Sequence, residues 1–131
     1  MKGIAVYPGK MNSSHIVEID TPIIGSDEVL VKVLQVGIDG TDSEIDEGLY
    51  GDTPSGSPFL IIGHESFGIV EDVGSEVNEF MKGDYVVATV RRPCKECINC
   101  KNGQSDMCLT GNYFERGIKG LHGFMADYYK E

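Results

Sequence analysis

The sequence has few basic residues. Only 11 lysines and arginines stand against 21 aspartates and glutamates in 131 residues, which gives a formal net charge of -10. A chain this acidic repels phosphate backbones and anionic lipids, so its composition argues against binding to nucleic acid or to a membrane surface. Cations, neutral polar molecules and metal ions are the partners that this charge favours.

Long apolar runs are also missing. No segment approaches the roughly 20 residues that a bilayer-spanning helix needs, and the apolar stretch after Lys2 is too short for a signal peptide. We therefore expect a cytoplasmic protein with no membrane partner. The sequence has no internal repeat and no Pro- or Ser-rich linker, so we expect one domain covering residues 1–131.

The apolar pattern predicts strands separated by turns. Valine-rich alternation in "EVLVKVLQVGI", Glu28–Ile38, is typical of a strand, and "GDYVVATV" predicts another. The stretch "FLIIGHESFGIVEDVG" is interpreted as an apolar entry, a glycine-flanked corner and a strand through Ile69 and Val70. Since 17 glycines favour turns over long helices, we expect a mainly β fold, a partly closed β-barrel with short helices.

Two short helices are predicted. The segment "TDSEIDEG" is compatible with a helix whose N-cap is Thr41 or Asp42, with Glu44 near the capping-box position and Gly48 as terminator. Between Cys94 and Gly111 the periodicity disappears, except for one helical turn predicted near residues 98–102 and ended by Gly103.

The four cysteines have metal-ligand spacing. They follow the pattern C-x2-C-x2-C-x7-C, at Cys94, Cys97, Cys100 and Cys108. Short spacings let thiolates wrap one ion, and the longer return supplies the fourth corner of a tetrahedron. We predict a closed structural zinc site that fixes a cysteine-rich lobe at about residues 91–111.

The cysteine pattern has two other interpretations. C-x2-C-x2-C opens some ferredoxin motifs, but those continue with x3-C-P, whereas here the gap is seven residues and Pro93 precedes the cluster. Four unconnected core cysteines are the other alternative, and their clustering in a polar, glycine-rich loop argues against it. Zinc is favoured over both.

A second group able to bind a cation lies at the glycine-flanked corner. The stretch "IIGHESFGIVEDVGSEV" fits G-H-E-x2-G-x5-G-x2-V, with Gly63, His64, Glu65, Gly68, Gly74 and Val77 in the named positions. A histidine followed by a carboxylate can reach a cation from one side. The flanking glycines permit close backbone approach, which raises a functional role for His64 above that of a hydrogen-bonded structural histidine.

The motifs "GIDGTD", "GHE-x2-G-x5-G-x2-V", "KGDYVV" and the cysteine lobe occur in an order that resembles the zinc-containing medium-chain alcohol and polyol dehydrogenases. Within that family, "ATVRRPCKECINC", "DMCLTGNYFERGI" and "GLHGFMADYY" are most similar to archaeal-type glucose (aldose) 1-dehydrogenases. The resemblance implies a GroES-like catalytic domain, normally followed by a Rossmann domain that binds NAD or NADP in the cleft between them.

The resemblance assigns roles to five residues. Asp39 occupies the position where most relatives have a cysteine ligand to the catalytic zinc, and His64 and Glu65 match the histidine ligand and the adjacent glutamate. Thr41 matches the hydroxyl residue that contacts the reacting oxygen, and Glu115 matches a glutamate that binds sugar hydroxyls. Taken alone, Asp39 would be a hairpin-turn residue, Thr41 a helix N-cap and Glu115 a solvated loop acid.

The implied activity is oxidation of the C1 hydroxyl of glucose or a related aldose, with hydride transfer to NAD or NADP. No G-x-G-x-x-G lies between a strand and a helix, so we expect the Rossmann domain to be absent from this chain. The chain would then be inactive alone and part of a longer, homo-oligomeric enzyme. A related alcohol or polyol dehydrogenase domain and a non-catalytic, zinc-stabilised binding module remain alternatives.

Four further residues receive structural interpretations. Arg91 and Arg92 follow a predicted strand beside the cysteine lobe and are expected to form solvated ion pairs. His122 is interpreted as structural or cleft-lining, and His15 as exposed.

Overall fold

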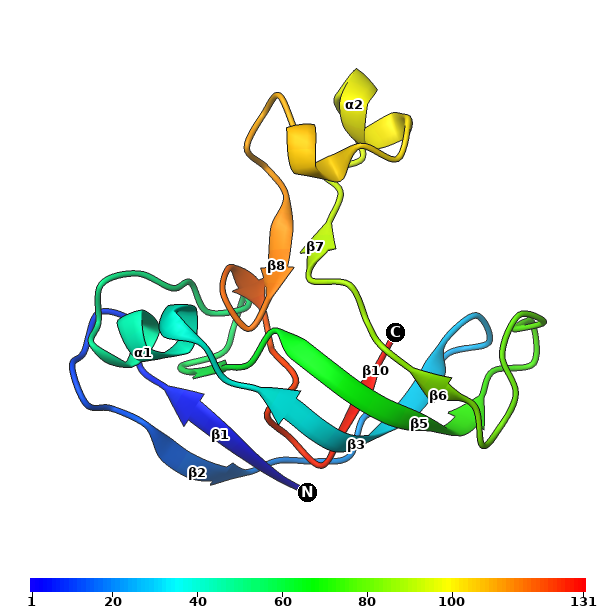
Figure 1. Cartoon of the computed structure of the whole chain (residues 1–131), viewed down its shortest axis with the longest axis horizontal. Coiled ribbons are helices and arrows are strands. Elements are labelled where there is room, and N and C mark those ends of the chain that lie inside the picture. Colours follow the sequence, from blue (N-terminus) through cyan, green and yellow to red (C-terminus); the bar gives the residue numbers. More distant parts are fainter.

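The computed structural model describes residues 1–131, which form three small sheets and two short helices (Figure 1). One sheet has the order β2-β1-β4, a second β10-β3-β5-β6 and a third β7-β8-β9. The strands are β1 (Lys2–Val6), β2 (His15–Glu18), β3 (Val29–Gly37), β4 (Leu60–Ile61), β5 (Glu65–Val73), β6 (Tyr85–Val86), β7 (Arg91–Arg92), β8 (Phe114–Arg116), β9 (Gly120–Leu121) and β10 (Tyr128–Lys130). The expected mainly β fold is confirmed, and the sheets do not close into one barrel.

The antiparallel pair β3 and β5 forms the centre of the body. Its register runs from Val29 opposite Val73 to Gly37 opposite Glu65, and both predicted strands are confirmed. Gly68 is required in this pair because a Cβ there would lie 2.5 Å from Val31 Cγ1. The register places Glu65 beside the end of β3, where the chain leaves the sheet.

A short helix, α1 (Gly40–Asp46), follows β3 directly. Its N-cap is Asp39, whose Oδ1 accepts a hydrogen bond from the Thr41 N–H at 2.7 Å, so the expected N-cap at Thr41 or Asp42 is wrong. Asp42 instead completes a capping box by accepting the Asp39 N–H at 3.1 Å. The helix begins at Gly40 because Asp39 accepts the N–H of Thr41 and Asp42 accepts the N–H of Asp39. This capped helix takes the place of the hairpin turn that Asp-Gly alone predicts.

The end of α1 agrees in part with the sequence. Gly48 follows the C-cap with φ +79°, as predicted for a helix terminator. Glu44 has no part in the capping box; its carboxylate accepts a hydrogen bond from the Tyr50 hydroxyl at 2.6 Å.

Two apolar cores meet at one segment. Phe124 belongs to the cluster under β3 and β5, whereas Met125 belongs to the cluster under β1, β4 and α1. The backbone N–H groups of Gly123, Phe124 and Met125 donate to carbonyls of residues 61–63, which fixes this segment against the chain after β4. Only glycine fits at position 123, because a Cβ there would lie 2.3 Å from the Gly63 carbonyl oxygen.

The cysteine lobe projects from the body on an arm made by β7 and β8 (Figure 1). Inside it lie α2 (Ile98–Lys101) and a 3-10 turn, η1 (Ser105–Met107), and the helical turn predicted there is confirmed, with Gly103 at φ +76° after it. The strand predicted over "GDYVVATV" pairs only at β6, Tyr85–Val86. Residues 87–90 leave the sheet and form the wall of a cleft. No helix has the length and apolar character that crossing a membrane requires.

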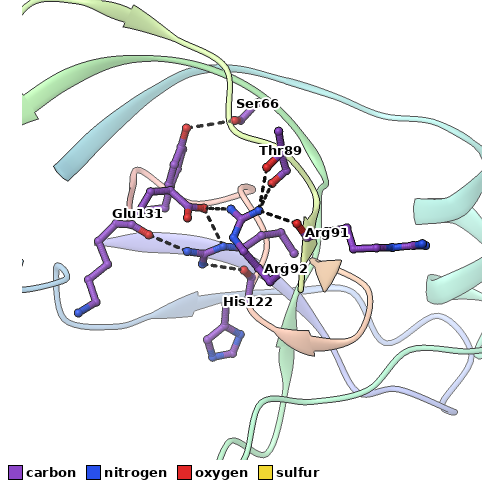
Figure 2. A network of polar contacts seen from close by, with 9 residues as sticks. Ser66, Thr89, Arg91, Arg92, His122 and Glu131 are labelled. Carbon is purple, nitrogen blue, oxygen red and sulfur yellow. Dashed lines mark hydrogen bonds and ion pairs between the residues drawn. The ribbon is translucent and has the colours of Figure 1, made fainter. Parts of the chain in front are cut away.

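A charged network fastens the base of this arm to β10 (Figure 2). Arg116 donates to the carbonyls of His122 and Lys130 and to Glu131 Oε1, at 3.2, 2.6 and 3.0 Å. Arg92 contacts the same Glu131 carboxylate and donates to the Thr89 carbonyl at 2.6 Å. The ion pair expected for Arg92 is confirmed. The pair is not solvated as expected, because the Arg92 side chain is only 24% exposed.

The two structural histidines differ. His122 accepts the Ile61 N–H on Nδ1 at 3.1 Å and stacks on Phe59 with ring centroids 5.5 Å apart, so the expected structural role is confirmed. The expectation that His15 is exposed is wrong, because its ring is half-buried and stacks on Tyr7 at 4.7 Å.

Burial, together with the positive charge of Arg116, lowers the pKa of His122 from its ordinary value of 6.5. Below that pH the unfolded chain takes up a proton that the folded His122 resists, so stability is present above about pH 6.5 and is lost as the pH falls. We expect His122→Gln to reduce the fall in free energy of unfolding between about pH 7 and about pH 5, measured by urea denaturation. An equal slope in His122→Gln and in the parent would contradict the assignment.

Candidate active site

The Gly-His-Glu corner is built by a glycine that no other residue could replace. Gly63 has φ +90°, and a Cβ there would lie 2.6 Å from Met125 Cγ. Its carbonyl accepts the Phe124 N–H at 2.9 Å, and its N–H donates to Asp42 Oδ1 at 3.2 Å. The chain therefore turns sharply between β4 and β5 and presents His64 and Glu65 on the side where α1 begins.

The three ligand residues expected for a catalytic zinc come together. Asp39, His64 and Glu65 each offer one ligand atom within 4.8 Å of the others, and Asp39 Oδ2 lies 3.4 Å from His64 Nε2. Gly37 opens the space for the third, since a Cβ on it would lie 2.2 Å from Glu65 Oε2. An imidazole and two carboxylates are a donor set that zinc accepts.

Asp42 lies beside the corner, although the sequence pattern predicts it only as an N-cap candidate. Its carboxylate is 3% exposed and accepts the N–H groups of Asp39 and Gly63. Asp42 Oδ1 also lies 3.7 Å from His64 Nδ1, a buried nitrogen without any hydrogen-bond partner. The capping-box spacing of Asp39 and Asp42 was the signal available in the sequence.

This arrangement decides which nitrogen of His64 faces a metal. The Asp42 carboxylate, 3.7 Å from Nδ1, is too far away for a hydrogen bond, but its negative charge favours a proton on that side, which leaves Nε2 available as the ligand atom. His64 is 11% exposed, and Nε2 points to Asp39. The geometry therefore fits a cation between Asp39, His64 and Glu65.

The electrostatics favour a cation as well. Partial burial raises the pKa of Asp39, but the hydrogen bond from the Thr41 N–H and the nearby His64 outweigh it, so the pKa lies below its ordinary value. The Asp39 carboxylate is consequently ionised at neutral pH. Together with Glu65 it supplies negative charge beside a single imidazole.

A cleft of about 840 Å³ opens beside the corner. Its lining includes His64 and Glu65 from the corner, residues 87–91 after β6, Ser105 and Asp106 of the lobe, and Glu115 of β8. Thr41 is half-buried in the first turn of α1 and is not part of this lining. Glu115 is 17% exposed and ion-paired with Arg91, so it is neither solvated nor in a loop.

The cysteine lobe brings its four sulfurs together without a disulfide. All four Sγ atoms lie within 4.8 Å of one another, and Cys97 and Cys100 are buried. The backbone N–H of Cys97, the Thr110 hydroxyl and the N–H of Glu96 lower the pKa of Cys94 to about 6, whereas burial raises the pKa of Cys100 to about 12. Converging thiols of this kind fit a tetrahedral metal site, which contradicts the alternative of four unconnected cysteines.

Comparison with known proteins gives consistent matches. The family model of the alcohol dehydrogenase GroES-like domain matches residues 25–130. A glucose 1-dehydrogenase of Methanocella arvoryzae is 52% identical over all of this chain and 37% of its own length. The chain thus spans little more than a third of such relatives.

Solved structures agree in fold. The glucose dehydrogenase of Haloferax mediterranei in complex with NADP, Zn and gluconolactone has a TM-score of 0.88 at 41% identity, over 100% of this chain and 36% of that protein. A cobalt- and zinc-bound alcohol dehydrogenase of Pyrobaculum aerophilum has a TM-score of 0.81 at 30% identity, over 100% and 39%.

Asp42→Asn tests the support of the histidine. The substitution removes the negative charge behind His64 Nδ1, and we expect zinc affinity at the corner to fall about 10- to 100-fold. Affinity for the cysteine site should not change, and competition with a chelator distinguishes the two. Asp46→Asn is the control, because Asp46 lies on the same helix and accepts the Ser14 N–H. Equal corner affinity in Asp42→Asn and the parent would contradict the role.

Proposed function

Because the chain belongs to the alcohol dehydrogenase GroES-like domain family, we propose that it is the catalytic domain of a zinc- and NAD(P)-dependent dehydrogenase acting on glucose or a related aldose. The domain covers residues 1–131, with a structural zinc lobe at about residues 91–111. One observation carries the proposal: His64 and Glu65, two of three clustered ligand residues, share a cleft with Glu115.

Asp39, His64 and Glu65 are the residues that would hold the catalytic zinc, and Cys94, Cys97, Cys100 and Cys108 the structural one. When bound at the corner, zinc supplies Lewis acidity that makes an alcohol more acidic. The chain provides three ligands and leaves one side open to the cleft, which is the pattern of a catalytic rather than a closed site.

Thr41 is proposed to take the proton that leaves the C1 hydroxyl. Its N–H is held by Asp39 Oδ1, which fixes the residue two positions from the first ligand. A hydroxyl group can accept one proton while it donates its own, so Thr41 Oγ1 would relay the proton along a hydrogen-bond chain to solvent water. The residue is half-buried, which limits competition from bulk water.

Glu115 is proposed to bind the hydroxyls of the sugar. A carboxylate on the cleft wall suits an uncharged substrate with many hydroxyl groups better than a simple alcohol. An apolar substrate would remove water from the Glu115 carboxylate and offer no hydrogen bond in return. The relatives support this choice, since one is named glucose 1-dehydrogenase and another was solved with gluconolactone, which is glucose oxidised at C1.

The nicotinamide cofactor would bind through a Rossmann domain elsewhere in a longer protein. The relatives are almost three times as long as this chain, and the Haloferax structure contains NADP. We also propose that the longer protein is a cytoplasmic homo-oligomer, as the sequence leads us to expect.

The test uses the full-length, zinc-loaded protein. We expect glucose or another aldose to drive reduction of NAD or NADP, followed by absorbance, and Asp39→Ala to lower kcat/KM by more than about tenfold. Reduction with linear polyols or simple alcohols but with no aldose would identify the related alcohol or polyol dehydrogenase instead. A binding module would show no turnover in the metal-loaded parent and no effect of Asp39→Ala.

A further inference from the structure

Arg91 lies where the cysteine lobe, the arm and the cleft meet. We propose that Arg91 is a positioning residue that holds one oxygen of Glu115 and leaves the other free for a sugar hydroxyl, an inference that rests on the proposed function. Arg91 itself would not contact the reacting atoms.

The contact between the two side chains is one-sided. Arg91 Nε and Nη2 donate to the same atom, Glu115 Oε1, at 3.1 and 2.6 Å. No hydrogen bond reaches Oε2, and the carboxylate lines the cleft. A charge-assisted pair of this kind fixes the direction of the carboxylate, so that Oε2 can accept from a substrate without first losing a protein partner.

The other side of Arg91 is held by the lobe. Its Nη1 donates to the Asp106 carbonyl at 3.3 Å and lies 3.8 Å from Asp106 Oδ1. Asp106 stands in η1, two residues before Cys108. Metal binding by the cysteines would therefore also fix the carbonyl that orients Arg91.

An aromatic ring completes the support. The Arg91 guanidinium lies over the Tyr113 ring at 4.1 Å from its centroid, and Lys119 Nζ lies 4.1 Å from the same centroid. Lys119 also donates to the Gly111 carbonyl at 2.6 Å. A guanidinium stacks flat on a ring while its edge binds a carboxylate, and an ammonium group cannot reproduce both contacts.

Arg92 provides the matched comparison. The strand register pairs Arg91 with Glu115 and Arg92 with Phe114. In Figure 2 the Arg91 side chain points away from the network that Arg92 forms with Glu131 and Thr89. The two neighbouring arginines of β7 thus have different contacts: Arg91 binds Glu115 on the cleft wall, and Arg92 binds Glu131 at the base of the arm.

The expected effect of losing Arg91 is on substrate binding. Glu115 would hold a hydroxyl that does not react, so the contact is the same in the ground state and the transition state. Weakening it should raise KM and leave kcat nearly unchanged. A merely structural role would instead lower stability or affect both constants.

The experiment compares variants of the full-length protein with glucose. Arg91→Gln is expected to raise KM about tenfold with kcat within about twofold, Arg91→Lys to fall between it and the parent, and Arg92→Gln to keep the parent KM. Unchanged KM in Arg91→Gln, or an equal rise in Arg92→Gln, would overturn the proposal while leaving the proposed function intact. A parent that oxidises no aldose would overturn both.

A double variant tests whether Arg91 acts through Glu115. If it does, Arg91→Gln combined with Glu115→Gln should raise KM no more than Glu115→Gln alone, because the partner is already lost. Multiplied effects of the two substitutions on KM would show independent roles and overturn the proposal. Urea denaturation of each variant checks that the effects do not come from a loss of folded protein.

Discussion

The buried carboxylate of Asp42 is the contact on which the candidate active site depends. It accepts the N–H of Asp39 and the N–H of Gly63, so one side chain joins the start of α1 to the corner before β5. The same carboxylate faces His64 Nδ1 at 3.7 Å. A buried charge is stable only when its donors are in place, which makes the positions of helix, corner and imidazole depend on one another.

The cleft is supported from two sides. The body supplies His64 and Glu65 at the end of the β3–β5 pair, while the arm supplies Glu115, whose position follows from Arg91. The network of Arg116 and Glu131 fastens the base of the arm to β10. A metal bound by the four cysteines would therefore be connected to the Glu115 side of the cleft through Asp106 and Arg91 rather than isolated at a distant tip.

Local patterns explain what could be predicted from the sequence. The strand β3 and the cysteine cluster follow from residues that are close together in the chain, so the sequence predicts both. The proximity of Asp39 to His64 is predicted only through the family resemblance. By local rules Asp39, Thr41, Asp42 and Glu44 could each cap α1. In the structure Asp42 also accepts the buried N–H of Gly63, which is distant in the sequence, and Asp39 is the N-cap. The Arg91–Glu115 pair and the His15 stack likewise depend on contacts that no local pattern encodes.

Anomalous diffraction at the zinc edge from crystals of the metal-loaded protein tests the central claim most directly. Two peaks per chain are predicted. One should lie about 2.3 Å from the four cysteine sulfurs and the other about 2.0–2.2 Å from His64 Nε2 and an Asp39 oxygen. A single peak at the cysteines, or a second metal bound through His64 Nδ1, would contradict the metal site that Asp42 is inferred to support.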